Sequence, residues 1–231
     1  MLPPTLSAID ITTLFTTFLS KYWWILLIII ALKIFRLPSV KGWFGEQLVN
    51  RALKRLPATD YHLFHDFYLP RPDGKGTTHI DHLVVSRFGL FVIETKNYQG
   101  WIFGSEKQRT WTQQIYKKKH KFQNPLHQNP LHQNALHINA LIHFLQLEKS
   151  VFHNLVYFVG DCTLKTKLPE NVLTHGLPSF IKGHQKELLT ESELTHCLEI
   201  LKQTVTNKPQ AAKQHVKQLK QRKAARGLRS I

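Results

Sequence analysis

The sequence predicts an α/β fold in which helices flank a mixed β-sheet, preceded by an apolar helix near the N-terminus. Short runs rich in Val, Ile and Phe alternate with segments whose apolar residues recur every three or four positions. That alternation of strand and helix patterns is typical of α/β domains. With 231 residues, the chain has room for one domain of ordinary size and terminal extensions.

The apolar segment near the N-terminus is an unbroken run over residues 22–32. A membrane span needs about 20 residues, so the run suffices only when extended to Leu37, with Lys33 and Arg36 reaching the headgroups. The first twenty residues contain no Lys or Arg, which disfavours a cleaved signal peptide. A buried helix of the folded domain is the other alternative.

We therefore expect a membrane anchor over about residues 22–37. Lys and Arg are more frequent after this segment than before it. The positive-inside rule then predicts a single-pass protein of the inner membrane whose folded domain is cytoplasmic.

The remaining elements follow in order along the chain. Helical spacing of apolar residues predicts a helix over 45–56, which Pro57 ends. Two apolar runs separated by Arg87, Phe88 and Gly89 predict a β-hairpin, and Thr190 with Glu193 forms a capping box at the start of a helix that ends near residue 205. Further strands are predicted over 61–69, 80–86, 90–98, 100–104, 109–116 and 154–160, and a further helix over 134–148.

The chain is strongly basic, with 31 Lys and Arg against 15 Asp and Glu and a formal net charge of +16. Residues 207–231 carry basic side chains and no acid. This balance suits a polyanion, either nucleic acid or an anionic membrane surface, and the basic tail suits both. The two cysteines, Cys162 and Cys197, lie far apart, which argues against a disulfide framework and a cysteine zinc site.

Charged residues interrupt both strands of the predicted hairpin. If the hairpin turns through Phe88 and Gly89, Asp81 lies opposite Lys96 and shares a face with Glu94. Two carboxylates with the carbonyl oxygen of Thr95 would offer hard ligands for Mg²⁺ or Mn²⁺, and the lysine could orient or deprotonate a water. A structural salt bridge formed by Lys96 explains the same residues, and the pattern alone leaves both interpretations open.

A wider set of motifs resembles one known family. The set comprises Gly45-Glu46 at a helix start, Ile80-Asp81-His82, GLFVIETKN over 89–97, Gly100, Trp111 and an Asn-Pro-x-x-Gln-Asn element. In order and spacing it resembles the NERD (nuclease-related) domain, and the hairpin resembles the PD-(D/E)xK nuclease signature. The resemblance implies a restriction-endonuclease-like fold, with Asp81 and Glu94 as metal ligands, Lys96 as the water-activating lysine and Glu46 as an auxiliary carboxylate.

The Asn-Pro-x-x-Gln-Asn element occurs twice, because a five-residue unit is duplicated over 124–134. Only the second copy runs directly into a helical pattern, so Gln133 is preferred over Gln128 as the glutamine that the resemblance implies. His127, His132 and His137 recur every five residues, so they cannot share one face of a helix. A histidine metal site is therefore not expected.

The function predicted from the sequence is a membrane-anchored, Mg²⁺- or Mn²⁺-dependent nuclease that hydrolyses phosphodiester bonds of DNA, with RNA left open. The alternative is a catalytically silent, membrane-attached module that binds nucleic acid on a nuclease fold. The predicted organisation is an N-terminal segment over 1–40, a nuclease-like domain over 41–160, an extension of that domain over 161–206 and a basic tail over 207–231.

Overall fold

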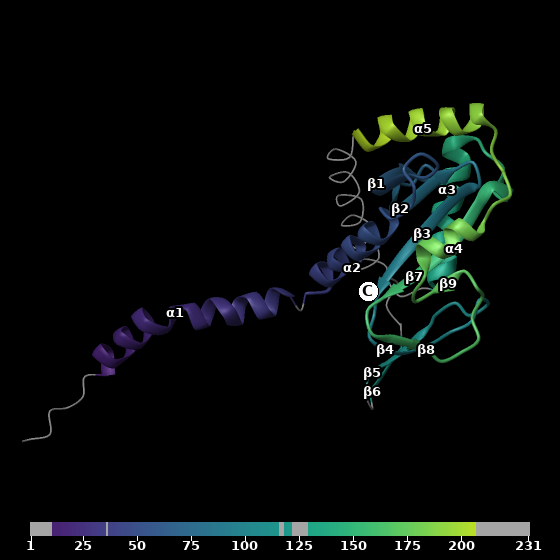
Figure 1. Ribbon diagram of the computed structural model, residues 1–231. Helices are drawn as coiled ribbons and strands as arrows, with labels where there is room; N and C mark the ends of the chain where they lie inside the picture. Colours follow the sequence, from purple (N-terminus) through teal and green to yellow (C-terminus); the bar gives the residue numbers. More distant parts are fainter. Residues whose placement is uncertain (1–10, 36, 116–117, 122–128, 207–231) are drawn as a thin grey trace, which may run out of the picture. The chain divides into compact units, whose positions relative to one another are not determined.

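The computed structural model describes residues 11–35, 37–115, 118–121 and 129–206 (Figure 1). The chain divides between residues 44 and 45 into two compact units. The first contains helix α1 (Ile11–Phe35) and the start of helix α2 (Pro38–Leu53), and the second contains the rest of α2 and everything that follows. The predicted basic tail over 207–231 lies outside the described residues.

The described part of the N-terminal unit is helical, apart from residue 37. In α1 the described apolar side chains are exposed, with Trp23, Leu26 and Leu32 each more than half accessible. Within the described part of the chain, no single helix combines the length and hydropathy of a membrane span, but Ser20–Phe35 and Ser39–Leu53 do so together, with a bend of 68° between them. The predicted anchor ends at residue 37, and the structure begins a new helix, α2, at the next residue. The proline at that position fits the first turn of a helix. The predicted helix over 45–56 therefore begins earlier.

The second unit is built on a mixed five-stranded sheet with strand order β1-β2-β3-β7-β9. The first three strands are antiparallel, whereas β3, β7 and β9 are parallel. This mixed pairing confirms the predicted fold class at the level of a mixed sheet with flanking helices. The strands are β1 (His62–Pro70), β2 (Thr77–Ser86), β3 (Gly89–Asn97), β7 (Phe152–Val159) and β9 (Val172–Leu173).

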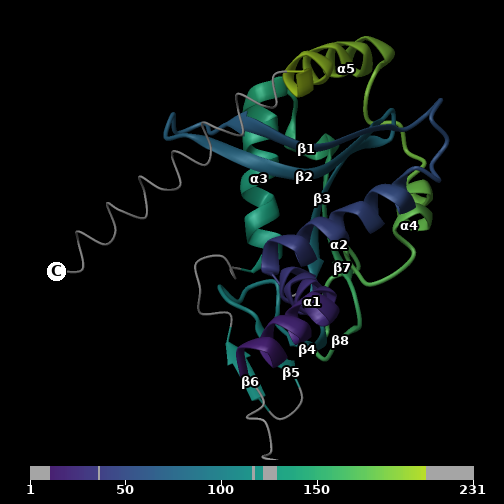
Figure 2. The ribbon, with the colours of Figure 1, turned by 90° about the vertical axis from the view of Figure 1, so that its left-hand side faces the viewer.

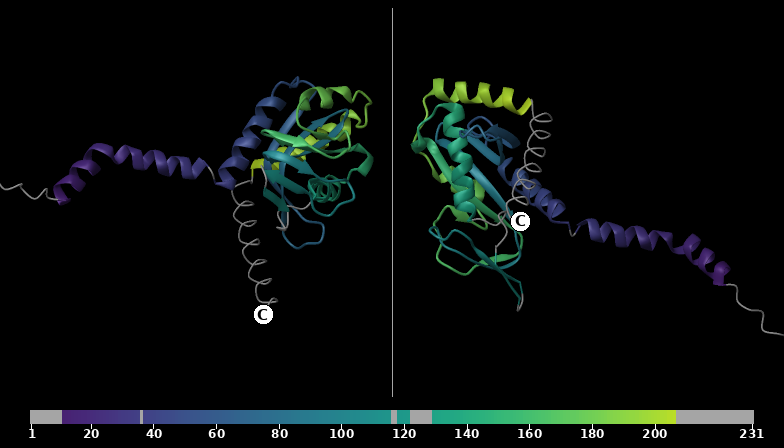
Figure 3. Two further views of the ribbon diagram at one scale, coloured as in Figure 1. Left: turned by 90° about the horizontal axis from the view of Figure 1, so that it is seen from below. Right: turned by 180° about the vertical axis from the view of Figure 1, so that it is seen from behind.

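Helices cover both faces of this sheet (Figure 2). Leu83 and Val92, which are register partners, pack into the core formed with α3 (Pro130–Leu145) and α5 (Glu191–Thr206). Their neighbours Val84 and Phe91 pack on the other face, against the C-terminal part of α2 and against α4 (Leu177–Gly183). The alternation follows from the two-residue period of a strand. The left view of Figure 3 looks along α3 and shows α2 across the sheet from it.

A second sheet extends the parallel pair of the first. Its strands are β4 (Gly100–Phe103), β5 (Thr112–Ile115), β6 (Lys118–Lys121) and β8 (Cys162–Leu164), in the order β6-β5-β4-β8. β3 leads into β4 and β7 leads into β8, and both pairs are parallel. The chain bends between them at Gly100 and Gly160, whose φ angles of 79° and 101° are left-handed. A side chain at Gly160 would also meet the carbonyl of Tyr98, so glycine is required there.

The structure confirms most of the predicted elements and moves several of their boundaries. The helix predicted over 134–148 begins at Pro130, because Asn129 Oδ1 accepts a hydrogen bond from Leu131 N at 3.0 Å and caps it. The same helix ends at Leu145, where Gln146 adopts a left-handed conformation. The predicted capping box is confirmed, since Thr190 N donates to Glu193 Oε2 at 2.8 Å. The strands β6, β8 and β9, the helix α4 and a 3₁₀ turn over Lys149–Val151 were not predicted.

Asn134 joins α3 to the sheet and gives a test of the packing. Its Nδ2 donates to Val92 O at 2.7 Å, to Asn154 Oδ1 at 2.8 Å and to Leu155 O at 3.0 Å. Because Asn134→Ala leaves these buried acceptors without this donor, we expect it to lower the free energy of unfolding by about 3 kcal/mol. Asn139→Ala, on the exposed side of the same helix, should change it by less than about 0.5 kcal/mol. Equal urea midpoints for the two variants would contradict the assignment.

Candidate active site

The hairpin that carries the charged residues turns at Arg87 and Phe88, and Ser86 pairs with Gly89. Ser86 stabilises this turn, because its Oγ accepts a hydrogen bond from Phe88 N at 3.2 Å and donates one to Gly89 O at 3.2 Å. The turn expected at Phe88 and Gly89 is therefore wrong by one position. As a result His82 lies opposite Ile93, and the predicted pairings of Asp81 with Lys96 and of Leu83 with Glu94 do not form.

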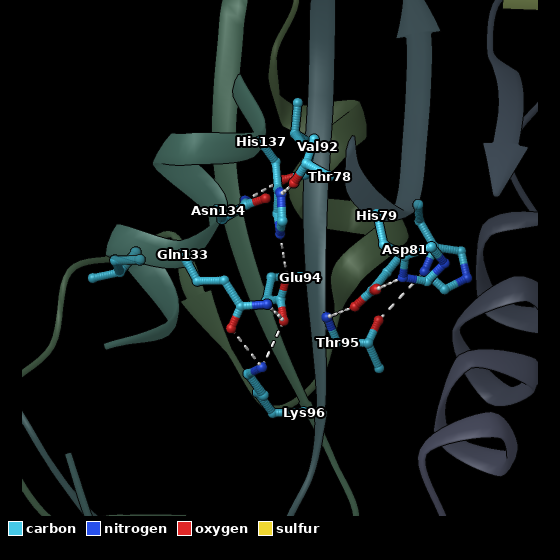
Figure 4. Close-up of polar contacts among 12 residues, drawn as sticks. Thr78, His79, Asp81, Val92, Glu94, Thr95, Lys96, Gln133, Asn134 and His137 are labelled. Carbon is cyan, nitrogen blue, oxygen red and sulfur yellow. Dashed lines mark hydrogen bonds and ion pairs between the residues drawn. The ribbon is translucent and has the colours of Figure 1, made fainter. Parts of the chain in front are cut away.

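The carboxylate of Asp81 occupies the place where the two strands separate. The β2–β3 pairing ends at His82 and Ile93, and beyond it Asp81 Oδ2 accepts a hydrogen bond from Thr95 N at 3.0 Å. A side chain thus replaces a backbone partner, which fixes Asp81 against β3 between Glu94 and Lys96. Figure 4 shows this contact on one side of the β3 ribbon and the Glu94 side chain on the other.

A histidine bridges Asp81 to a second acid. His79 Nδ1 lies 3.3 Å from Asp81 Oδ1, and His79 Nε2 lies 2.8 Å from Asp66 Oδ1. Burial lowers the pKa of His79, but its hydrogen bonds to Asp66 and Asp81 outweigh burial and raise that pKa to about 10. Burial raises the pKa of Asp81, but the His79 contact outweighs it and lowers that pKa. His79 is therefore a cation held between two carboxylates.

Glu94 forms a separate group with residues of β3 and α3. Its side chain is buried, and its Oε1 accepts hydrogen bonds from Lys96 Nζ at 2.6 Å and from Gln133 Nε2 at 2.8 Å. Lys96 Nζ also donates to Gln133 Oε1 at 3.0 Å, which closes a triangle of three side chains (Figure 4). Burial lowers the pKa of Lys96, but the neighbouring Glu94 outweighs it and raises that pKa, so the lysine is charged.

The second oxygen of Glu94 has no such partner. His137 Nε2 lies 3.2 Å from Glu94 Oε2, yet the two atoms lack hydrogen-bond geometry, and among the described residues neither atom has a hydrogen-bond partner. His137 Nδ1 is held by Thr78 Oγ1 at 2.7 Å. Glu94 Oε2 is therefore a buried acceptor that faces the site without a donor, which is costly unless a ligand completes it.

Glu46 brings a third carboxyl group near this region from the C-terminal part of α2. Burial raises its pKa to about 7, and the negative charge of Asp81 adds to the increase. Glu94 contributes in the same direction by a smaller amount. Glu46 is thus close enough to both carboxylates for their charges to oppose its ionisation.

Two histidines of the site were missed by the sequence reasoning. His137 was considered only as part of a histidine repeat, yet it lies four residues after Gln133 in α3 and so faces the same way. His79 was not among the predicted site residues, although it is two residues before Asp81 and so lies on the same side of β2. Of the two candidate glutamines, Gln133 reaches Lys96 and Glu94, whereas Gln128 lies outside the described residues.

The arrangement offers a cation a partial set of ligands. Over the part of the chain that the structure describes, no group of three or more His, Cys, Asp or Glu side chains is placed to hold a metal ion. The predicted ligand set contains only two such side chains, Asp81 and Glu94. Its third member is the backbone carbonyl oxygen of Thr95. The unpartnered Glu94 Oε2 fits a hard cation, because a carboxylate oxygen is the ligand that Mg²⁺ and Mn²⁺ prefer.

The contact of Glu94 with Lys96 gives a stability test. Lys96→Met leaves Glu94 buried without its counter-charge, so we expect a loss of about 3 kcal/mol in the free energy of unfolding of metal-free protein. Glu94→Gln combined with Lys96→Met should recover most of that loss, since no buried charge remains. Additive losses in the double variant, measured by chemical denaturation, would show that the two groups do not interact.

Comparisons with known proteins agree with this geometry. Residues 41–159 match the family described as the NERD, or nuclease-related, domain. An uncharacterised protein of Bacillus anthracis is 37% identical over 188 residues, which cover 79% of this chain and 85% of that protein. No solved structure matches the chain. The chain therefore belongs to the nuclease-related domain family.

Proposed function

We propose that this chain is a metal-dependent nuclease that hydrolyses phosphodiester bonds of DNA. The observation that carries the proposal is the state of Glu94. One of its oxygens is held by Lys96 and Gln133, and the other, which lies 3.2 Å from His137 Nε2, is buried without a hydrogen bond to any described residue. Family membership supports a nuclease-related activity, and the basic composition supports a polyanionic substrate.

Each side chain has a distinct part in the proposed reaction. Asp81 and Glu94, with the carbonyl oxygen of Thr95, would hold Mg²⁺ or Mn²⁺. Such an ion, when bound, polarises the scissile phosphate and lowers the pKa of a nearby water. Lys96 carries a proton at Nζ and is positioned by Gln133, so it can orient the attacking water or stabilise the negative charge that develops on the phosphate.

Glu46 and His79 support these groups. With a pKa near 7, Glu46 can gain or release a proton at physiological pH, which suits an auxiliary carboxyl group. His79 holds the Asp81 carboxylate in place through Nδ1, as does the backbone of Thr95. A carboxylate with fixed orientation loses little conformational freedom when a cation binds.

The proposal also includes a membrane anchor over about residues 22–37. The exposed apolar side chains of α1 support it, because contiguous apolar surface on a helix is costly in water. The folded domain would then act at the cytoplasmic side of the membrane. The tail over 207–231 would contact DNA or anionic lipid through its basic side chains.

The central prediction concerns cleavage. With Mg²⁺ or Mn²⁺, the full chain should cleave DNA, and Asp81→Asn, Glu94→Gln and Lys96→Ala should each lower the rate by at least about 100-fold. The first two changes remove ligand charge and keep side-chain size, whereas the third removes the positioned ammonium. Asp73→Asn, which alters an exposed acid in the loop after β1, is the matched control and should cleave normally.

Thermal melts with and without Mn²⁺ separate the two classes of function. If Glu94 is a ligand, Mn²⁺ should raise the melting temperature of wild type and of Lys96→Met, and should not raise that of Glu94→Gln. Should the wild type cleave no DNA or RNA with either ion, and should Mn²⁺ leave every melting temperature unchanged, the nuclease proposal fails. A catalytically silent nucleic-acid-binding module would then account for the fold.

The anchor is tested by membrane fractionation. We expect the full chain to remain in the membrane pellet after carbonate extraction, because residues 22–37 would be embedded in hydrocarbon. A variant that begins at residue 38 should move to the supernatant. Release of the full chain by carbonate would contradict the anchor and favour an internal helix or a peripheral association.

A further inference from the structure

The second sheet carries an exposed aromatic side chain beside polar and basic groups. Strand register places Trp101 of β4 between Gln114 of β5 and Thr163 of β8. Trp101 is 47% exposed, whereas Ile102, the next residue in β4, is fully buried on the other face. The indole ring is thus held by the sheet with its surface open to solvent. Lys165 Nζ lies over the ring, 4.5 Å from its centroid.

The same face is hollowed next to the tryptophan. An open hollow of about 510 Å³ is lined by Trp101, Gln114 and Thr163, and also by Gln99 and Asp161. Its wall therefore combines an aromatic ring with amide and hydroxyl groups that can both donate and accept hydrogen bonds. A planar group with polar edges fits such a wall better than a purely apolar ligand.

We propose that this face, formed by Trp101, Gln114, Thr163 and Lys165, binds an unpaired nucleotide of a single-stranded nucleic acid. Trp101 would stack on the base, because bases of every sequence present a flat π-surface to an aromatic side chain. Gln114 and Thr163 would contact the base edge or the sugar. Lys165 would leave the ring on its flexible stem and neutralise a neighbouring phosphate.

Charge favours nucleic acid as the occupant. The ammonium group of Lys165 is part of the face. Asp161, which also lines the hollow, disfavours a phosphate at its own end, so the backbone of the bound strand should follow the lysine side. A duplex is disfavoured, because its bases are already stacked and paired and cannot reach the indole ring.

The position of the face in the chain connects it to the candidate active site. β3 carries Lys96 and is followed by β4, which carries Trp101, so Trp101 lies five positions after Lys96 in the chain. Even a fully extended chain of that length spans at most about 18 Å. A strand held at Trp101 can therefore reach the catalytic hairpin within a few nucleotides. The inference rests on the proposed function for the identity of the substrate as nucleic acid. It adds that the bound part of the substrate is single-stranded.

The test measures binding without cleavage. Fluorescence anisotropy of the full chain in EDTA, with a labelled single-stranded oligonucleotide and its duplex, gives both dissociation constants. Trp101→Leu should weaken single-strand binding by about 10-fold, because stacking is lost while apolar bulk is kept. Trp101→Phe, which keeps an aromatic ring, should retain most of the affinity. Duplex binding should change by less than about twofold in both.

The lysine has its own control. Lys165→Gln should weaken single-strand binding and flatten its salt dependence, since one phosphate contact is lost. Lys149→Gln removes an exposed lysine and should change neither the affinity nor its salt dependence. Lys149 lies just before the start of β7, whereas β8 follows the other end of that strand. Circular dichroism of each variant verifies that the fold is retained.

Other outcomes overturn the inference. These are an absence of single-strand binding by wild type, equal affinities for Trp101→Leu and Trp101→Phe, or equal losses for single strand and duplex. Weaker binding of Trp101→Leu to anionic vesicles, with oligonucleotide affinity unchanged, would assign the face to lipid instead. Binding is measured without metal, so the two proposals can fail separately. If the wild type cleaves normally and Trp101→Leu keeps its affinity, only this inference is refuted. If the affinity depends on Trp101 but nothing is cleaved, only the nuclease proposal is refuted.

Discussion

The buried carboxylate of Glu94 is the constraint on which the site depends. Glu94 is 2% exposed in the middle of the sheet, where an ionised group needs donors to offset its lost hydration. β3 supplies one donor through Lys96, two residues further along the same face. All other nearby donors come from α3, so the helix has to lie at a fixed height and rotation against the sheet.

Asn129 and Asn134 set that height and rotation. Asn129 starts α3 with a side-chain cap, and its Nδ2 also donates to three carbonyl groups of the loop between β4 and β5, those of Ser105, Glu106 and Gln108. Asn134 then fastens the first turns of the helix to β3 and β7. Between these two anchors, Gln133 is directed at Lys96 and Glu94. The two asparagines of the Asn-Pro-x-x-Gln-Asn element thus fix α3 against the sheet, and this position directs its glutamine at the site.

The sequence predicted the β2–β3 hairpin and the start of α5 because their signals are local. Alternating apolar residues, a short turn and a capping box depend on neighbours in the chain, and the structure contains all three. The turn position could not be derived, since it depends on the hydrogen bonds of the Ser86 hydroxyl. His79 and Asp66 could not be paired either, because their contact requires the β1–β2 register and the left-handed conformation of Asp66. The short strands β8 and β9 depend on pairing partners far away in sequence.

The separation of the charged groups explains how the site can be stable without a cation and still suit one. Asp81 has its own cation in His79, and Glu94 has its own in Lys96. Neither carboxylate therefore relies on a metal for its charge balance, which is consistent with two groups that lie on different sides of β3 (Figure 4). A cation held at Glu94 Oε2 and at Asp81 would compete with the neighbouring histidines, His137 and His79. Lys96 and Gln133 contact the other oxygen, Oε1, so these two hydrogen bonds can remain when a cation is held at Oε2.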